Sequence, residues 1–155
     1  MSDATALARL RLAAPALSVG VLAADLLNLG REVGRLEQAG VPALHFDVMD
    51  GCFTPMLTVG PAFIRAIKTP LLKDVHLMIR EPLDRLGEYV AAGADIVTVH
   101  IESSVHVHRV LQHLGTFRNA NDPARGIVRG VALNPGFFQP PPCLIHMPKL
   151  SIRHN

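Results

Sequence analysis

The sequence predicts an α/β fold in which parallel strands alternate with helices, and three observations support this prediction. Short apolar segments alternate with segments of helical spacing along most of the 155 residues. The apolar segments are almost uninterrupted, which is typical of parallel strands that are covered on both faces. Polar side chains occur toward the ends of these segments, where parallel α/β folds carry their sites. A chain of this length is expected to form one domain with a substantial core.

The strands are identified as apolar runs that end at turn-forming residues. The second and third runs are short and bounded by Gly or Pro, and the fourth is rich in β-branched residues. The fifth run ends at the turn sequence Asn-Pro-Gly of residues 134–136. The predicted strands are residues 15–23, 43–49, 72–79, 95–101 and 127–133.

The helices are identified by their apolar spacing and by the residues that start and stop them. Pro61 and Pro82 suit a first helical turn, because the N–H group that proline lacks is not needed there. Gly40 and Gly93 follow the last periodic residues and supply stops. The last helix is expected to be capped by a serine, either Ser103 or Ser104, and to stop at Gly115. The predicted helices are residues 25–39, 60–68, 82–92 and 103–114.

Two architectures fit this order of elements, a doubly wound open sheet and a (β/α)8 barrel of the TIM type. No GxGxxG or GxxxxGK[ST] sequence follows the first strand, so the phosphate-binding loop of a nucleotide-binding sheet is missing. Polar residues at several strand ends favour the barrel. A complete barrel typically needs about 250 residues, so we expect an incomplete one of about five of the eight βα units.

The domain organisation follows from this count. We expect the partial barrel over residues 1–136 and an irregular, divergent tail over residues 137–155. Three consecutive prolines at 140–142 exclude a helix in that tail. It is either a terminal arm that docks on a partner or the result of a truncated or frame-altered C-terminus.

The composition excludes several classes of function. Hydrophobic residues make up 49% and charged residues 18%, and the formal net charge is only +2, without a basic run. Aromatic residues make up 5% and Trp is absent, so base-stacking platforms and a nucleic-acid partner are not expected. Cys52 and Cys143 lie far apart without CxxC spacing, which excludes a disulfide framework and favours a reducing, cytoplasmic location. No segment approaches the about 20 apolar residues of a membrane span.

The most informative polar residues lie on the second and third predicted strands. Because side chains alternate along a strand, His45, Asp47 and Met49 share one face of the second strand, and His76 and Met78 share one face of the third. Two imidazoles and a carboxylate that converge from neighbouring strands form a ligand set for a divalent metal such as zinc or iron. The alternative is a pair of buried histidines that are hydrogen-bonded to backbone carbonyls.

Other polar residues are expected to have structural roles. Asp50 has the wrong strand parity to join Asp47, and we expect it to cap the tight turn at Gly51. Glu102 and His100 lie at the end of the fourth strand. We expect Glu102 to be a structural residue and His100 to be a hydrogen-bonded strand-end histidine. Surface positions on the last helix are expected for His106, His108 and His113.

Several ordered blocks of the sequence resemble the ribulose-phosphate 3-epimerase family. The resemblance covers about residues 15–136 in the correct order. Its blocks are His-Phe-Asp-Val-Met-Asp-Gly at 45–51, Thr-Val-Gly-Pro at 58–61, Asp-Val-His-Leu-Met at 74–78, Gly-Ala-Asp at 93–95 and Thr-Val-His-Ile-Glu at 98–102.

The resemblance implies a barrel isomerase that interconverts D-ribulose 5-phosphate and D-xylulose 5-phosphate by proton transfer at C3 through an enediolate. It implies that His45, Asp47 and His76 are ligands of a divalent ion (zinc, iron, manganese or cobalt) and that Asp47 is also a catalytic acid–base group. His76, Met49 and Met78 are expected to contact the sugar phosphate. For the two methionines the alternative is ordinary core packing.

The chain departs from the family pattern in two places. Ala23, in the sequence Leu-Ala-Ala-Asp at 22–25, occupies the position of a serine whose hydroxyl contacts substrate in the family. The family's second catalytic aspartate lies on a seventh strand, beyond the five predicted here. The alternative function is therefore an inactive or assembly-dependent barrel fragment that acts as an interaction module. Open strand edges would pair with a second copy, so a homo-oligomer is expected, or with a separate C-terminal half. A related barrel decarboxylase is disfavoured, because Met49 stands where those enzymes carry a lysine.

Overall fold

A computed structural model describes residues 8, 10, 12 and 14–138. Five strands and four helices of more than one turn follow one another in this part of the chain. The strands are β1 (Ser18–Gly20), β2 (Ala43–Met49), β3 (Leu72–Met78), β4 (Ile96–His100) and β5 (Val128–Ala132). The helices are α2 (Leu29–Gln38), α3 (Pro61–Ala66), α4 (Leu86–Ala91) and α5 (Val107–Leu114).

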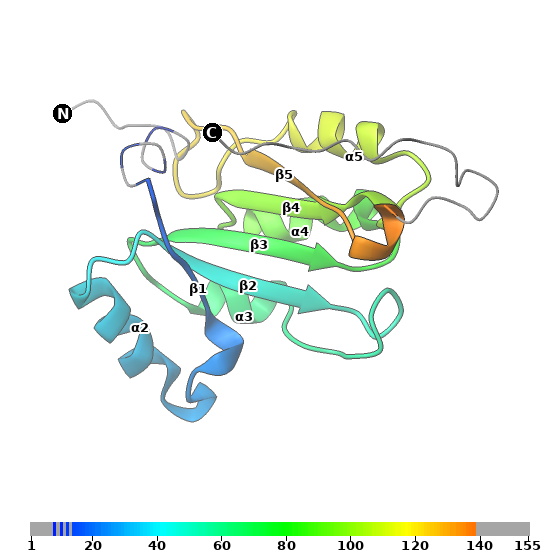
Figure 1. Ribbon diagram of the computed structural model, residues 1–155. Helices are drawn as coiled ribbons and strands as arrows, with labels where there is room; N and C mark the ends of the chain where they lie inside the picture. The colour runs from blue at the N-terminus through cyan, green and yellow to red at the C-terminus, as the bar shows by residue number, and fades with distance from the viewer. Residues whose placement is uncertain (1–7, 9, 11, 13, 139–155) are drawn as a thin grey trace, which may run out of the picture.

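The sheet decides between the two architectures. All four strand pairs are parallel, and the spatial order β1-β2-β3-β4-β5 is the order of the sequence (Figure 1). A doubly wound sheet reverses its strand order at a switch point, whereas a barrel adds each strand next to the previous one. The expectation of a partial (β/α) barrel is therefore confirmed.

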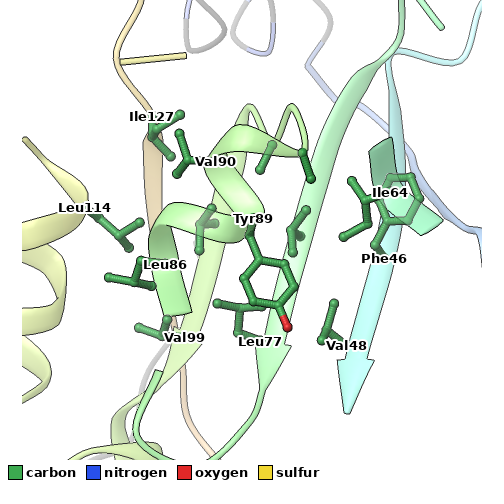
Figure 2. Close-up of a cluster of buried hydrophobic side chains, with 14 of the residues drawn as sticks. Phe46, Val48, Ile64, Leu77, Leu86, Tyr89, Val90, Val99, Leu114 and Ile127 are labelled. Carbon is green, nitrogen blue, oxygen red and sulfur yellow. The ribbon is translucent and has the colours of Figure 1, made fainter. Parts of the chain in front are cut away.

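The four helices pack on one face of the sheet. In Figure 1, α3 and α4 lie behind the strands. Buried side chains of β2, β3 and β4 form a single cluster with residues from α2, α3, α4 and α5. Figure 2 shows Leu86 and Tyr89 of α4 beside Leu77 and Val99 of the sheet, with Phe46 and Ile64 packed together nearby. Burial of this apolar surface is the main stabilising contribution to the fold.

The opposite face of the sheet is only half covered, which corrects the expectation that both faces are buried. Along β2 and β3, fully buried residues alternate with partly exposed ones. The partly exposed positions include His45, Asp47 and His76. The buried apolar residues at the alternate positions, such as Phe46, Val48 and Leu77, point toward the helices. The other apolar residues of the two strands, Ala43, Met49, Leu72 and Met78, lie on the same face as His45 and His76. In barrel terms the half-covered face is the inner, lumen-facing surface.

Some element boundaries differ from the predictions because short 3-10 helices replace parts of strands and helices. β1 stops at Gly20, and Val21–Ala23 forms a 3-10 turn. A second 3-10 turn, Leu26–Asn28, precedes α2, and Asp25 Oδ1 accepts the Leu27 N–H at 3.1 Å. Pro82–Arg85 is also 3-10, so the regular part of α4 begins later than expected.

The predicted serine cap of the last helix was wrong. Helix α5 begins at Val107, its N-cap residue is His106, and no side chain caps it. Ser103 Oγ donates instead to the His100 carbonyl at 2.7 Å, and Ser104 Oγ donates to Glu81 at 2.9 Å. Ile101–Ser103 consequently forms a separate 3-10 turn. Past β5, Pro135–Phe138 is 3-10, and the tail predicted over 137–155 lies outside the described residues from 139 onward.

Candidate metal and substrate site

The pairing of β2 with β3 brings the predicted site residues together. In this parallel pair Asp47 is in register with His76, His45 with Asp74, and Met49 with Met78. Residues in register on neighbouring strands point to the same face of the sheet, and Phe46 and Val48 between them are buried on the other face. The sequence prediction placed these residues at the ends of the strands. The structure corrects this, because β2 and β3 stay paired over seven residues and the three side chains lie within them.

The three predicted ligands form one cluster. Asp47 Oδ1 lies 3.2 Å from His45 Nε2 and 3.2 Å from His76 Nδ1. One ligand atom from each residue lies within 4.8 Å of the other two. Their side chains are 26%, 32% and 20% exposed for His45, Asp47 and His76, so an ion could reach them from the lumen side. Two imidazole nitrogens and a carboxylate oxygen are common ligands of zinc and of transition-metal ions, so the residues present fit such an ion.

The structure adds a carboxylate that the sequence interpretation did not assign, Asp74. Its Oδ2 lies 2.8 Å from His45 Nδ1 and accepts a hydrogen bond from Ser18 Oγ at 2.9 Å. Asp74 therefore joins three neighbouring strands through one oxygen atom. The sequence did contain a signal, because Asp74 lies two residues before His76 and must share its face.

His100 supports the second imidazole of the cluster from the next strand. It is 6% exposed, and its Nε2 lies 2.8 Å from His76 Nε2. The two rings stack with centroids 4.9 Å apart at an angle of 19°, and Phe53 packs against His100 at 5.0 Å. The sequence predicted a hydrogen-bonded strand-end histidine here, and the structure places His100 in contact with His76, beside the three predicted ligands.

The two histidines of the cluster, His45 and His76, have pKa shifts of opposite sign. The hydrogen bond to Asp74 raises the pKa of His45 above 6.5, with burial opposing this effect and the Asp47 charge assisting it. Burial lowers the pKa of His76 below 6.5, and the neighbouring His100 lowers it further against the opposing effect of Asp47. At neutral pH the His76 ring is therefore ready to offer a lone pair, while His45 is held by a carboxylate on one side.

The remaining candidate residues take the following places. Met49 and Met78 are half-buried and in register one step beyond Asp47 and His76, on the same face. Ala23 lies exposed in the 3-10 turn after β1. The two methionines therefore lie beside the cluster, and Ala23 lies just beyond the end of the edge strand β1.

Asp50 and Glu102 have the structural roles that were predicted for them. Asp50 Oδ1 accepts the N–H groups of Cys52 and Phe53 at 2.8 Å each, and Oδ2 accepts the Arg80 N–H at 2.9 Å. Glu102 Oε1 accepts the Asn134 N–H at 2.7 Å, which ties the end of β4 to the segment after β5. The surface positions expected on α5 are confirmed for His106, His108 and His113, which are exposed.

Comparison with known proteins is consistent with this site. Residues 16–139 match the profile of the ribulose-phosphate 3 epimerase family. The chain is 42% identical over 123 residues to the chloroplastic ribulose-5-phosphate-3-epimerase of Arabidopsis thaliana, covering 77% of this chain and 41% of the relative. It is 41% identical over 117 residues to ribulose-phosphate 3-epimerase of Bacillus subtilis (74% and 50%) and 44% identical over 121 residues to that of Rhodobacter capsulatus (75% and 48%).

The chain spans about half the length of the curated relatives it matches. Among the described residues, we find no helix with the length and apolar character that a membrane crossing requires.

Proposed function

Because the chain belongs to the ribulose-phosphate 3-epimerase family, we propose that it catalyses proton transfer at C3 of a ketopentose phosphate, the step that interconverts D-ribulose 5-phosphate and D-xylulose 5-phosphate. The observation that carries the proposal is the convergence of His45, Asp47 and His76 on the lumen face, with ligand atoms within 4.8 Å of one another. The domain that performs this chemistry is the partial barrel, up to residue 136.

In this proposal the three clustered residues hold a divalent ion, which is zinc, iron, manganese or cobalt. A bound ion of this kind supplies Lewis-acid stabilisation of negative charge on the substrate oxygens. His45 would contribute Nε2 and His76 would contribute Nδ1, since these are the nitrogens that face Asp47 Oδ1. His76, Met49 and Met78 would contact the substrate along the same face.

Asp47 is the proposed acid–base group. Its carboxylate is 32% exposed on the lumen face, so it can accept the C3 proton of a sugar phosphate bound there. Inversion at C3 also needs a proton donor on the opposite side of the substrate. The second carboxylate close to the cluster, Asp74, is engaged by His45 and Ser18. The described part of the chain is therefore equipped for proton removal, and we expect exchange at C3 to exceed net epimerisation.

The test is to load the purified protein with Co²⁺ and incubate it with ribulose 5-phosphate in heavy water. We expect deuterium at C3, detected by NMR, and a rate of exchange lower by about 10²- to 10⁴-fold with Asp47→Asn. A matched control is Asp84→Asn, which removes one exposed carboxylate from the turn before α4 and is expected to leave exchange unchanged. Loss of exchange in the control, or no exchange in the metal-loaded wild type, would contradict the proposal.

A specific observation favours a second candidate, an assembly-dependent barrel fragment. β1 pairs only with β2, and β5 pairs only with β4, so both edges of the described sheet present unpaired backbone groups. Val131 on β5 and Leu133 just after it are 47% and 42% exposed. Pairing with a second copy would cover these groups and give a homo-oligomer.

Light scattering coupled to size exclusion tests this second candidate. A dimer or larger species that dissociates on dilution, together with exchange activity that follows the oligomer, would support it. A monomer that unfolds cooperatively and still exchanges the C3 proton would contradict it.

The spacing of the two cysteines is the basis for also proposing a cytoplasmic location.

A further inference from the structure

We infer that Asp74 is a positioning residue, whose carboxylate holds the proton of His45 on Nδ1 so that the Nε2 lone pair faces the metal position. This inference rests on the metal site of the proposed function. It concerns how one ligand is oriented, and it can be tested on the metal-free protein.

The carboxylate of Asp74 is itself held in place by a residue of another strand. Its side chain is 16% exposed, half the exposure of Asp47 at 32%. Ser18 Oγ, from β1, donates to Asp74 Oδ2 at 2.9 Å, and the register of β2 with β3 places Asp74 directly beside His45. A carboxylate that is anchored from a second strand has little rotational freedom, so the direction of its lone pairs is defined.

The two ring nitrogens of His45 face two different carboxylates. Nδ1 lies 2.8 Å from Asp74 Oδ2, and Nε2 lies 3.2 Å from Asp47 Oδ1. A neutral imidazole carries one proton, so it can donate to only one of these oxygens. The contact to Asp74 is shorter, and its acceptor is already fixed by Ser18. The proton of the neutral ring therefore belongs on Nδ1.

This tautomer of His45 determines which atoms face one another among His45, Asp47 and His76. With the proton on Nδ1, the lone pair of Nε2 is directed at Asp47 Oδ1, and His76 Nδ1 lies 3.2 Å from the same oxygen. Electron-rich atoms brought this close are stabilised by a cation between them. A carboxylate that fixes the tautomer of a ligating histidine in this way typically changes metal affinity by about 10- to 100-fold when it is removed.

His76 offers an internal contrast. Its second nitrogen faces another imidazole, His100 Nε2 at 2.8 Å, instead of a carboxylate. Both ligand histidines are thus supported from behind, but only His45 is supported by an anion. The effect of removing Asp74 should appear in the protonation of His45 and leave the protonation of His76 unchanged.

The experiment compares wild type, Asp74→Asn, Asp74→Leu, Ser18→Ala and the charge-matched control Asp84→Asn. Nitrogen-15 NMR of labelled histidines in the metal-free proteins, above the titration range of the rings, reports which nitrogen of His45 carries the proton. Titration with Co²⁺ alone, followed by its visible absorption, reports affinity. The expected wild-type result is a proton on Nδ1 of His45 and saturable Co²⁺ binding.

Asp74→Leu is expected to weaken Co²⁺ binding by about 10- to 100-fold and to mix the His45 tautomers. Asp74→Asn keeps an acceptor oxygen and should retain the Nδ1 proton with a smaller loss of affinity. Ser18→Ala should have a smaller effect still, and Asp84→Asn none. Equal losses in the Asn and Leu variants would mean that only the charge matters, which would overturn the inference.

If the wild-type protein carries the proton on Nε2 of His45, the inference is overturned whatever the variants show. This measurement needs only the wild-type protein, so it decides the matter even if Asp74→Leu does not fold. The proposed function fails by a different result. Intact Co²⁺ binding with the expected His45 tautomer, but without C3 proton exchange, would remove the activity and leave the role of Asp74.

Discussion

The sheet carries two polar clusters, and their difference separates stability from function. At the amino ends of the strands, Asp95 Oδ2 accepts the Lys73 N–H at 2.9 Å, Asp95 Oδ1 accepts from Asn119 at 2.7 Å, and Lys73 Nζ donates to the Ile64 carbonyl at 2.7 Å. These three side chains are 1–6% exposed. On the lumen face, His45, Asp47 and His76 are 20–32% exposed and turn acceptor atoms toward one another.

The two clusters differ in burial and in the partners of their polar atoms. Around Asp95 each donor meets an acceptor inside the chain, as buried polar groups require. Around Asp47 one carboxylate oxygen lies 3.2 Å from His45 Nε2 and 3.2 Å from His76 Nδ1, and all three side chains are partly exposed. Strand β3 contributes one residue to each cluster, Lys73 near its amino end and His76 nearer its carboxyl end. Which face and which end a residue occupies decides its role.

The largest expected effect tests the lumen cluster. Asp47→Asn removes the proposed base and one ligand, so we expect C3 proton exchange to fall by about 10²- to 10⁴-fold, the usual contribution of a general base. The melting temperature should not fall, because Asp47 is not part of the core. Calorimetry alongside the exchange assay checks both statements. A large fall in melting temperature would show that this cluster is structural as well.

The second prediction tests the amino-end cluster. Asp95→Ala leaves the Lys73 N–H and the Asn119 amide without their acceptor, and each buried donor left unpaired costs about 1–3 kcal/mol. Urea unfolding should show the loss in the free energy of unfolding. Co²⁺ affinity of the folded fraction should stay unchanged. If affinity fell while stability did not, the division between the two clusters would be wrong.

A smaller effect is expected at the open end of β1. Ala23→Ser restores a hydroxyl at the position where the family has one, and a single added hydrogen bond is worth about 1 kcal/mol, or about fivefold in affinity. We expect ribulose 5-phosphate to bind more tightly by that factor, measured by the concentration dependence of exchange. Ala24→Ser, one residue further, is the control and should leave affinity unchanged.

The smallest effect is a pH dependence of the metal-free protein. The folded pKa of His45 is raised above the unfolded value of 6.5, chiefly by Asp74, so its interaction stabilises the fold fully below pH 6.5 and is lost as the pH rises through the folded pKa. His45→Gln should therefore destabilise the protein more at about pH 5.5 than at about pH 8.5. Urea unfolding of both proteins at the two pH values measures this. An equal difference at both would contradict it.

The strand–helix alternation and the shared face of His45 and Asp47 were predictable because both rest on local periodicity. The period of two places His45 and Asp47 on one face, and Gly40 and Gly93 end their helices with positive φ values of 70° and 98°. The boundaries around β1 and α5 were less predictable. Ser103 and Ser104 look like helix caps in the sequence, but they bond to partners that only the folded chain brings near.

The fold class and the strand face on which His45, Asp47 and His76 lie were readable from the sequence, because both follow from the spacing of residues along the chain. The contacts of Asp74 with His45 and Ser18, and of His100 with His76, follow only from the three-dimensional arrangement of the strands. These contacts join positions 24 to 56 residues apart, and they depend on the register between strands. Packing of the whole sheet against its helices sets that register, because a shift by one residue would turn every side chain to the other face.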